Sequence, residues 1–387
     1  MYSGRTVFAQ LLGYVPFEHF KYLALKLKSN HGTQSFTAWS HFVCMAYAQF
    51  TRREGLRDLV VCLNSQRAKL YHAGIKHAVS RATLADANEK RGCQLFELLG
   101  QRLIEMASAL HKDTDIGLGL KEPLYAMDST TIDLCLKLFP WADFRQTKAA
   151  VKAHTVIDLR GAIPVMVTIT TGKIHDINLL DTLQLPVGST VVLDRGYVDF
   201  GRLYALIQRE MNFVVRAKDN MRYEVVIDTP HDPSSGVRAD QVIRMVTIRS
   251  KNSYPEVLRR VAFYDEKSQL DLVFLTNRLD LSAVTIAAIY KQRWQIELFF
   301  KWLKQNLVVK HFFGNSVNAV KTQIWIAICT YLITVIAHRQ VTQKITLRNF
   351  MHLAEVNMFE KITLAQMVAN ALEGDEAQAL ARQEEMF

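Results

Sequence analysis

Residues 189–216 read STVVLDRGYVDFGRLYALIQREMNFVVR, and this stretch decides the class of fold that we expect. The apolar, β-branched run Thr190–Leu193 predicts a strand. Phe200–Glu210 has the spacing of an amphipathic helix, and Asn212–Arg216 predicts a second strand. Strand, helix and strand in succession are typical of an α/β domain.

The segments on either side extend this pattern. Strands are predicted upstream at Leu124–Met127, Thr131–Leu136, His154–Leu159 and Ile163–Thr170. The last two are joined at Arg160-Gly161, which predicts a hairpin, and Asp176–Leu185 predicts a short helix. Downstream, polar alternating sequence predicts a β-rich insertion over about 218–270, followed by a strand at Leu272–Thr276. Ser282–Leu307 predicts the longest helix of the chain, and helices are expected from there to the end.

Residues 1 to about 115 predict a separate helical region, because apolar residues recur at helical spacing. One of its helices is expected to begin after Ser80 or Thr83. Basic residues are dense here: Arg52, Arg53, Arg57, Arg67, Lys69, Lys76, Arg81, Lys90 and Arg91. We expect a DNA-binding module, and a plain helical domain with a solvated basic face is the alternative. The turn-forming sequence HKDTDIGLGLKEP, from His111, marks its end.

The amino-acid composition indicates what kind of partner the protein binds and in which cellular compartment it is expected. The formal net charge of +10 favours a polyanionic partner such as nucleic acid. The five cysteines are scattered, which argues against a disulfide framework or a zinc knuckle. The apolar stretch Ile324–Ala337 is shorter than a membrane span and predicts a buried helix. The N-terminus does not resemble a signal peptide, and we expect a cytoplasmic protein with no membrane association.

Two aspartates follow apolar strands. Asp128 lies in YAMDSTTIDL and Asp194 in STVVLDRGY. An ionised carboxylate in an apolar strand is costly unless it is paired or binds a cation. On neighbouring strands the two would form an oxygen-rich site of the kind that Mg²⁺ or Mn²⁺ prefers. Taken singly, each aspartate could instead cap a strand end.

The predicted helix over residues 282–307 carries a third carboxylate. At ~100° per residue, one narrow stripe contains Tyr290, Arg293, Glu297, Lys301 and Lys304. The opposite side is apolar and suits docking on a core, as in any amphipathic helix. Basic residues beside a metal-binding glutamate suit a phosphodiester substrate, because the carboxylate holds the cation and the basic groups hold the backbone.

These motifs together resemble a known family. YKQRWQIELFFKWLK (290–304) is similar to the Y-x-x-R-x-x-x-E-x-x-x-x-x-x-K signature of DDE transposases in insertion-sequence family four. The signature residues are Tyr290, Arg293, Glu297 and Lys304. YAMDSTTIDL and VVLDRGYVDF resemble the family's two aspartate regions. The segment 151–180, with Lys152, His154 and His175, is similar to the family as well.

The resemblance implies an α/β fold with three parts. These are a helical DNA-binding domain (1–115), an RNase H-like catalytic domain (120–310) interrupted by the insertion, and a helical C-terminal region (311–387) that could mediate dimerisation. It also implies metal-assisted attack of water, and then of a DNA 3′-hydroxyl, on phosphodiesters at insertion-sequence ends and in target DNA. Asp128, Asp194 and Glu297 would hold two Mg²⁺ ions, with Mn²⁺ as a substitute.

The implied partners are the element's terminal inverted repeats, target DNA and a second copy of the chain in a synaptic complex. DNA contacts are expected from Tyr290, Arg293, Lys304, Lys301, Lys152 and Arg195. His154 and His175 either have a structural role or lie close to the catalytic carboxylates, and both alternatives stay open. The insertion lacks the tryptophan on which relatives stack a flipped base, and Tyr254, Phe263 or Tyr264 could replace it.

Other readings stay open from the sequence. One is an RNase H-like nuclease that cuts DNA but does not join strands. Another is a decayed or domesticated transposase that only binds DNA, although all three carboxylates are present. No Gly-rich phosphate loop occurs, so ATP use is not expected.

Overall fold

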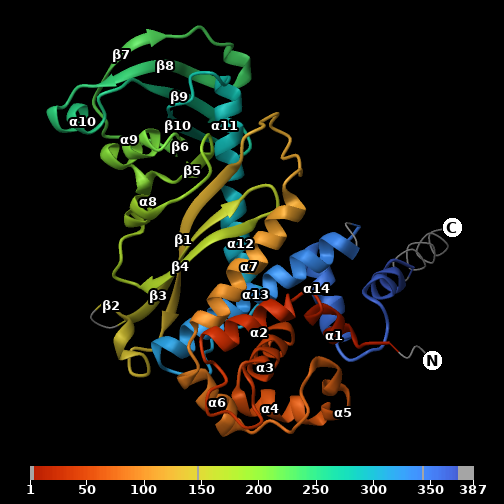
Figure 1. The fold of residues 1–387 in the computed structure, drawn as a ribbon. Helices are drawn as coiled ribbons and strands as arrows, with labels where there is room; N and C mark the ends of the chain where they lie inside the picture. The colour runs from red at the N-terminus through yellow and green to blue at the C-terminus, as the bar shows by residue number, and fades with distance from the viewer. Residues whose placement is uncertain (1–3, 146–147, 342–343, 374–387) are drawn as a thin grey trace. The chain divides into compact units, whose positions relative to one another are not determined.

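The computed structural model describes residues 4–145, 148–341 and 344–373 (Figure 1). It divides the chain into two compact units. Unit 2 consists of His111–Asp133 and Ala142–Phe300. Unit 1 contains the helices up to Leu110, the short segment Leu134–Trp141 and the helices from Lys301 onward. The unit boundary at Leu110 lies at the turn-forming segment that the sequence marks.

Unit 2 is built on one mixed sheet with the order β2-β3-β1-β5-β6-β10-β9-β8-β7, and β4 pairs with β3. The strands are β1 (Leu124–Leu134), β2 (Asp143–Arg145), β3 (Lys148–Asp158), β4 (Ile163–Thr171), β5 (Thr190–Leu193), β6 (Asn212–Arg216), β7 (Tyr223–Asp228), β8 (Val237–Met245), β9 (Leu258–Asp265) and β10 (Leu270–Thr276). β1, β5 and β6 run parallel, whereas β3 and β4 form the predicted antiparallel hairpin. The α/β prediction is confirmed.

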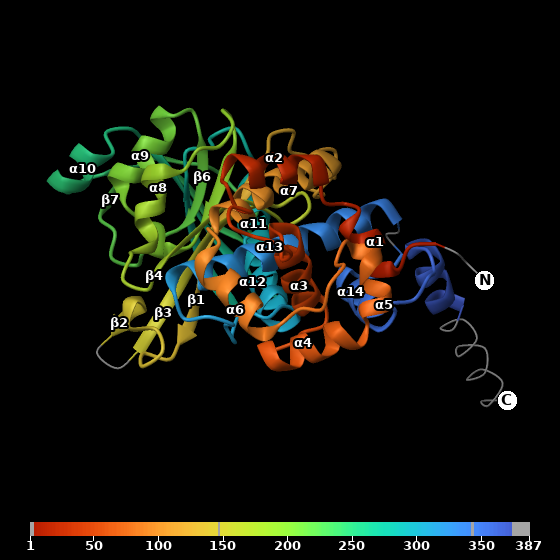
Figure 2. The ribbon, with the colours of Figure 1, turned by 60° about the horizontal axis from the view of Figure 1, so that its bottom comes forward.

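Helices cover both faces of the central strands (Figure 2). Val191 and Leu193 of β5 belong to the apolar cluster formed with α8 (Leu179–Thr182) and α9 (Phe200–Gln208). Successive strand residues point to opposite faces, and α11 (Ala283–Gln292) contacts β5 and β6 on the other side. The sheet therefore forms a buried middle layer, which explains the uninterrupted apolar runs of β5 and β6.

The predicted insertion continues the same sheet, because β9 pairs with both β10 and β8. One detail differs from the prediction. The alternating residues 241–249 divide between β8, which ends at Met245, and the short helix α10 (Ile248–Ser253). Thr247 caps that helix, because its side chain accepts a hydrogen bond from the Ser250 N–H.

The single helix predicted over Ser282–Leu307 is two helices, α11 and α12 (Trp294–Asn306), separated at Arg293. Ser282 caps the start, since its Oγ accepts a hydrogen bond from the Thr285 N–H at 3.0 Å. At the junction, the Arg293 N–H donates to the Tyr290 carbonyl three residues earlier, at 3.0 Å. Such bonds tighten the turn into a 3₁₀ geometry and interrupt the α-helix.

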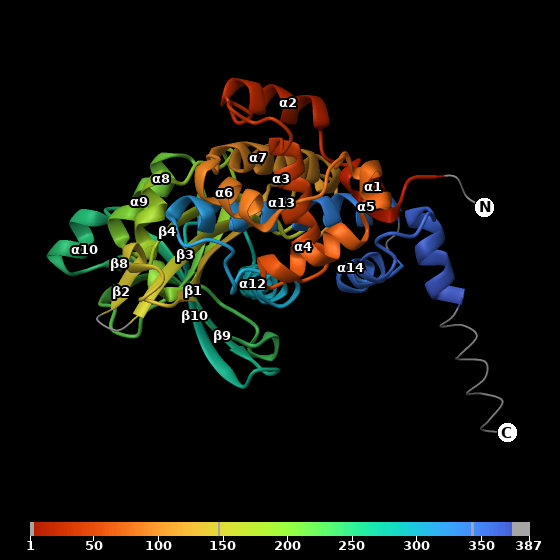
Figure 3. The ribbon, with the colours of Figure 1, turned by 90° about the horizontal axis from the view of Figure 1, so that it is seen from below.

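Unit 1 is helical and organised around α13 (Val317–Val341), the longest of the described helices at 25 residues. Its other helices include α1 (Val7–Leu12), α2 (Phe17–Lys26), α3 (Ala38–Phe50), α4 (Leu56–Ser65), α5 (Arg67–Leu70), α6 (Arg81–Lys90), α7 (Gln94–His111) and α14 (Leu347–Val356). α3, α6 and α14 all contact α13 (Figure 3). Ser80 caps α6, in agreement with one of the two predicted starts.

The helical regions at the two ends of the chain thus belong to one compact unit. The resemblance had implied two separate helical parts, 1–115 and 311–387. α13 is long and apolar enough to cross a membrane, yet its most apolar window is 94% buried. This confirms the predicted buried helix. Packing is tight at Gly100 of α7, where an added Cβ would lie 2.9 Å from the ring of Trp325.

A buried ion pair connects the insertion to the segment that leads into α11. Arg259 and Asp240 are both buried, and two hydrogen bonds of 2.8 and 2.7 Å join them. The same guanidinium donates to the carbonyls of Arg278 and Leu281, immediately before α11.

We expect Arg259→Ala to lower the free energy of unfolding by about 3–5 kcal/mol, because it leaves Asp240 buried and unpaired. Urea unfolding of the full chain measures this. The double variant Asp240→Leu/Arg259→Met should recover most of the loss, since no buried charge remains. A loss below about 1 kcal/mol in the single variant would refute the role assigned to the pair.

Candidate active site

The parallel pairing of β1 with β5 places two aspartates side by side. Met127 is aligned with Leu193 in this register, and each is followed directly by an aspartate, Asp128 or Asp194. Parallel strands present equivalent residues at the same level of the sheet. The two carboxylates that the sequence singled out are therefore neighbours on adjacent strands.

The backbone orients both side chains. Asp128 Oδ1 accepts a hydrogen bond from the Ser129 N–H at 2.8 Å, and Asp194 Oδ1 accepts one from the Arg195 N–H at 2.7 Å. Each carboxylate is thereby held by one oxygen, and its Oδ2 makes no backbone hydrogen bond among the described residues.

Arg293 links Glu297 to Asp128. Arg293 Nη2 donates to Glu297 Oε1 at 2.6 Å, and Arg293 Nη1 lies 3.9 Å from Asp128 Oδ2. The guanidinium also lies over the ring of Tyr290, 5.6 Å from its centroid. Tyr290 is itself buried against Phe274 of β10, with ring centroids 4.7 Å apart. At the break between α11 and α12, the positively charged Arg293 side chain thus contacts Asp128 and Glu297.

The electrostatics of Asp128 reflect its burial and its charged neighbours. Its pKa is raised to about 6, mainly by burial and in smaller part by the charges of Asp194 and Glu297, whereas the Ser129 N–H and Arg293 act in the opposite direction. A shift of this kind is typical of functional carboxylates that lie close to one another.

Tyr197 is a residue of this site that the sequence reasoning did not single out. It is buried, it follows Asp194 by three positions, and its side chain interacts with Ser129, the residue after Asp128. Burial raises the pKa of Tyr197, and the charges of Asp128, Asp176 and Asp194 add to the effect. Its place in the Asp194-Arg195-Gly196-Tyr197 turn was the signal available in the sequence.

A polar network on β3 involves two of the expected residues. Lys152 Nζ lies 3.1 Å from Asp176 Oδ1, and His154 Nδ1 lies 3.3 Å from the same oxygen. His154 is fully buried, and burial lowers its pKa. Its ring also lies within hydrogen-bond distance of Thr170 Oγ1, at 2.8 Å from Nε2. His175 is exposed and begins the turn that contains Asp176.

The remaining basic candidates are Arg195, Lys301 and Lys304. Arg195 is exposed next to Asp194. Lys301 and Lys304 follow Glu297 in the sequence of α12, in the part of that helix assigned to unit 1. Lys301 is exposed and Lys304 is half-buried.

The donor set fits a hard divalent cation, since Asp128, Asp194 and Glu297 offer only carboxylate oxygens. Within the ranges that the structure describes, no three acidic, histidine or cysteine side chains converge closely enough to hold an ion. The Arg293 guanidinium accounts for the separation of the carboxylates, because it pairs with Glu297 and lies near Asp128. To bind an ion, Glu297 would have to release Arg293.

Comparison with known proteins agrees with this geometry. A family model described as a transposase DDE domain matches residues 119–333, and one for a domain of unknown function matches residues 3–76. A relative from Sinorhizobium fredii, named as the transposase y4zB, is 32% identical over 288 residues, which cover 73% of this chain and 78% of the relative. A relative from Geobacillus stearothermophilus, named as the transposase of insertion sequence element IS5377, is 28% identical over 73% of this chain and 76% of its own.

Among solved structures, a piggyBac transposase synaptic complex with hairpin DNA matches with a TM-score of 0.44 and 10% identity. That match covers 95% of this chain and 80% of the other. A similarity of this size adds no argument to those above.

The raised pKa of Asp128 predicts a pH-dependent stability. Because the folded-state pKa of about 6 lies above the ordinary value of 3.8, the free energy of unfolding should fall as pH rises from about 4 to above 6. Asp128→Asn removes the buried charge, and we expect it to stabilise the metal-free protein by about 1–3 kcal/mol at pH 7.5. Near pH 4 it should have little effect. Thermal unfolding in a chelator measures both, and a destabilised variant at pH 7.5 would contradict the assignment.

Proposed function

The chain belongs to the DDE transposase family, and from that premise we propose that Asp128, Asp194 and Glu297 are its catalytic carboxylates. Enzymes of this family cleave DNA and transfer strands with divalent metal ions, and this chain is a DNA transposase. The observation that carries the residue assignment is the β1–β5 register, which makes Asp128 and Asp194 neighbours.

The proposed cofactor is a pair of Mg²⁺ ions, for which Mn²⁺ can substitute. When bound, such ions lower the pKa of the attacking water or hydroxyl and stabilise the leaving oxygen. The protein's own part is to hold the ligands. The Ser129 and Arg195 N–H groups orient the two aspartates, and Glu297 is presented in the first turn of α12.

Arg293 would then change partners. Its guanidinium pairs with Glu297. If Glu297 served as a metal ligand, the Arg293 guanidinium would be free to donate hydrogen bonds to a scissile phosphate at the same site. Tyr290, Arg195, Lys301 and Lys304 are proposed as further DNA contacts. Lys152 is engaged with Asp176 and would act on DNA only by leaving it.

The aromatic candidates for base stacking are not equivalent. Tyr254 is buried against Tyr204, so its face is not available. Phe263 lines a pocket of about 300 Å³ that Arg293 and the half-exposed Trp294 also line. If a base is extruded during the reaction, we propose that it stacks there rather than on Tyr254 or Tyr264.

We further propose that the basic helices of residues 1–115 bind the element's terminal inverted repeats, and that two copies act together in a synaptic complex with target DNA. Such a protein works on chromosomal DNA in the cytoplasm of a bacterium. A nuclease without strand transfer, or a protein that only binds DNA, is distinguished by an assay with a labelled element end.

The central prediction concerns the three carboxylates. Asp128→Ala, Asp194→Ala and Glu297→Ala should each abolish cleavage and strand transfer, because each removes a metal ligand, while binding of the element ends persists. Mn²⁺ should support activity, and Ca²⁺ should permit binding with little chemistry, since its looser coordination suits an in-line displacement poorly. Strand transfer near the wild-type rate from Glu297→Ala would exclude the mechanism.

A second prediction separates the catalytic from the structural role of Arg293. Arg293→Ala should reduce cleavage at least about 100-fold, as expected when a charge-stabilising donor is lost. The melting temperature should change little if the pair with Glu297 is worth about 1 kcal/mol. Lys291→Ala is the matched control, because Lys291 lies on α11 two residues before Arg293 and pairs with Asp265, the last residue of β9, at 3.4 Å. A large fall in melting temperature with activity retained would favour a structural role.

A further inference from the structure

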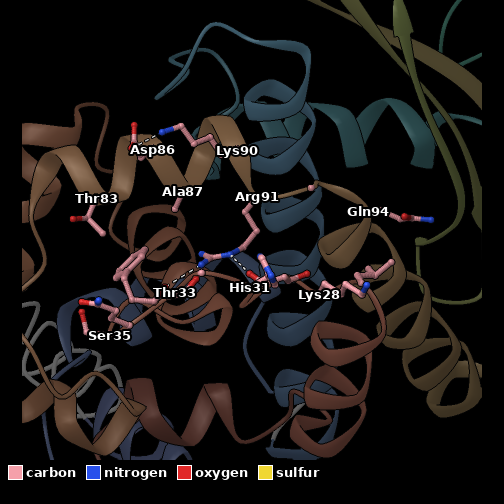
Figure 4. A pocket seen from close by; sticks show the side chains of 16 residues that line it. Lys28, His31, Thr33, Ser35, Thr83, Asp86, Ala87, Lys90, Arg91 and Gln94 are labelled. Carbon is pink, nitrogen blue, oxygen red and sulfur yellow. Dashed lines mark hydrogen bonds and ion pairs between the residues drawn. The ribbon is translucent and has the colours of Figure 1, made fainter.

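A basic pocket in unit 1 lies between the loop after α2 and helix α6 (Figure 4). Its volume is about 620 Å³, which is within the range of ligand sites. Polar side chains line it: Ser29, Thr33, Gln34, Ser35, Thr83 and Gln94. Such hydroxyl and amide groups can donate hydrogen bonds to phosphate oxygens.

The charges in this pocket favour an anion. Lys28, Lys90 and Arg91 line it together with His31, against the single carboxylate of Asp86. Lys90 Nζ is paired with that carboxylate at 2.8 Å. In Figure 4 the side chain of Lys90 turns toward Asp86, whereas Arg91 extends toward the loop. Lys28 is exposed and has no ion-pair partner among the described residues.

Arg91 holds the loop and leaves its charge uncompensated. Its Nε donates to the Ser29 carbonyl and its Nη2 to the Phe36 carbonyl, both at 3.0 Å, and its Nη1 is buried with no hydrogen-bond partner. Burial lowers the pKa of Arg91 to about 10, with no carboxylate to offset it. The group stays protonated at neutral pH, so the floor of the pocket carries a positive potential that an anion would neutralise.

Lys28 occupies a backbone position that favours glycine. Its φ is +50°, and its N–H bonds to the Leu25 carbonyl while the Ser29 N–H bonds to the Ala24 carbonyl. This pattern ends α2 in a Schellman motif, in which the left-handed residue is usually glycine. A lysine here costs stability. The cost is explained if the side chain is needed at the pocket.

We propose that this pocket binds a phosphate group of the DNA backbone, with Lys28 as its principal free cation and Arg91 as the fixed charge beneath it. The inference rests on the proposed function, because it takes DNA as the ligand. The open, exposed rim formed by Lys28 and His31 suits a polymer that passes over the surface. A free phosphate or nucleotide offers the same chemistry and is tested separately.

The decisive variant is Lys28→Gly in the full chain. It removes the cation and also relieves the left-handed backbone, so DNA binding should fall while thermal stability is unchanged or rises. Binding of labelled duplex at 100 mM salt should weaken about 3- to 10-fold, and the slope of log K against log salt should become shallower by about 0.9, as for one lost phosphate contact. Lys28→Arg should restore both.

Arg52→Gly is the matched control. Arg52 has a φ of +51°, and it ends α3 in the same motif, with the Arg53 N–H bonded to the Ala48 carbonyl. Arg52 is also one of the basic residues of the expected DNA-binding region, but it does not line the pocket and its guanidinium is paired with Glu355, so we do not assign it a phosphate contact. This variant therefore removes one cation from the same unit at the same backbone geometry. Its salt slope should equal that of the wild type.

Equal slopes for Lys28→Gly and the wild type would overturn the inference, as would equal losses in Lys28→Gly and Arg52→Gly. Millimolar inorganic phosphate provides the other arm. If it raises the melting temperature of the wild type but not of Lys28→Gly, and DNA binding is the same in both, the pocket takes a free phosphate and the DNA assignment is wrong. Failure of the wild type to bind or cleave DNA would instead refute the proposed function.

Discussion

The parallel pairing of β1 with β5 is the constraint on which the site depends, because it holds two carboxylates next to each other in a partly buried position. Burying a carboxylate beside other carboxylates is unfavourable, and the raised pKa of Asp128 reflects burial first and the charges of Asp194 and Glu297 second. The sheet tolerates it because β5 and β6 are anchored on both faces by helices. Stability is given up locally for a site that a divalent cation would complete.

Arg293 is the internal substitute for that cation. The tightened turn between α11 and α12 places its guanidinium between Glu297 and Asp128, while the ring of Tyr290 supports its face. An uninterrupted helix would carry the same residues along one stripe without this convergence. Arg293 and Glu297, which pair with each other here, are thus the residues proposed to bind the phosphate and the metal.

Parts of the chain outside the carboxylate site form the framework that carries it. The insertion continues the catalytic sheet, and the buried Arg259–Asp240 pair connects it to the start of α11. Helices from both ends of the described chain pack around α13 to form unit 1. A deletion of residues 1–115 would therefore remove part of a shared core, and point substitutions such as those at Lys28 are better probes of DNA binding.

The sequence by itself determined the α/β class, the strands Thr190–Leu193 and Asn212–Arg216, the hairpin at Arg160-Gly161 and the candidate carboxylates, because apolar periodicity and turn residues are local signals. Only the tertiary structure decided the break at Arg293, the ion pair with Glu297, the convergence of Tyr197 and Asp176 on the site, and the union of the two helical ends. These features depend on contacts between segments far apart in the chain, whose pairing no local pattern of residues encodes. The same is true of Lys28, since its left-handed backbone becomes meaningful only beside Arg91 and the pocket.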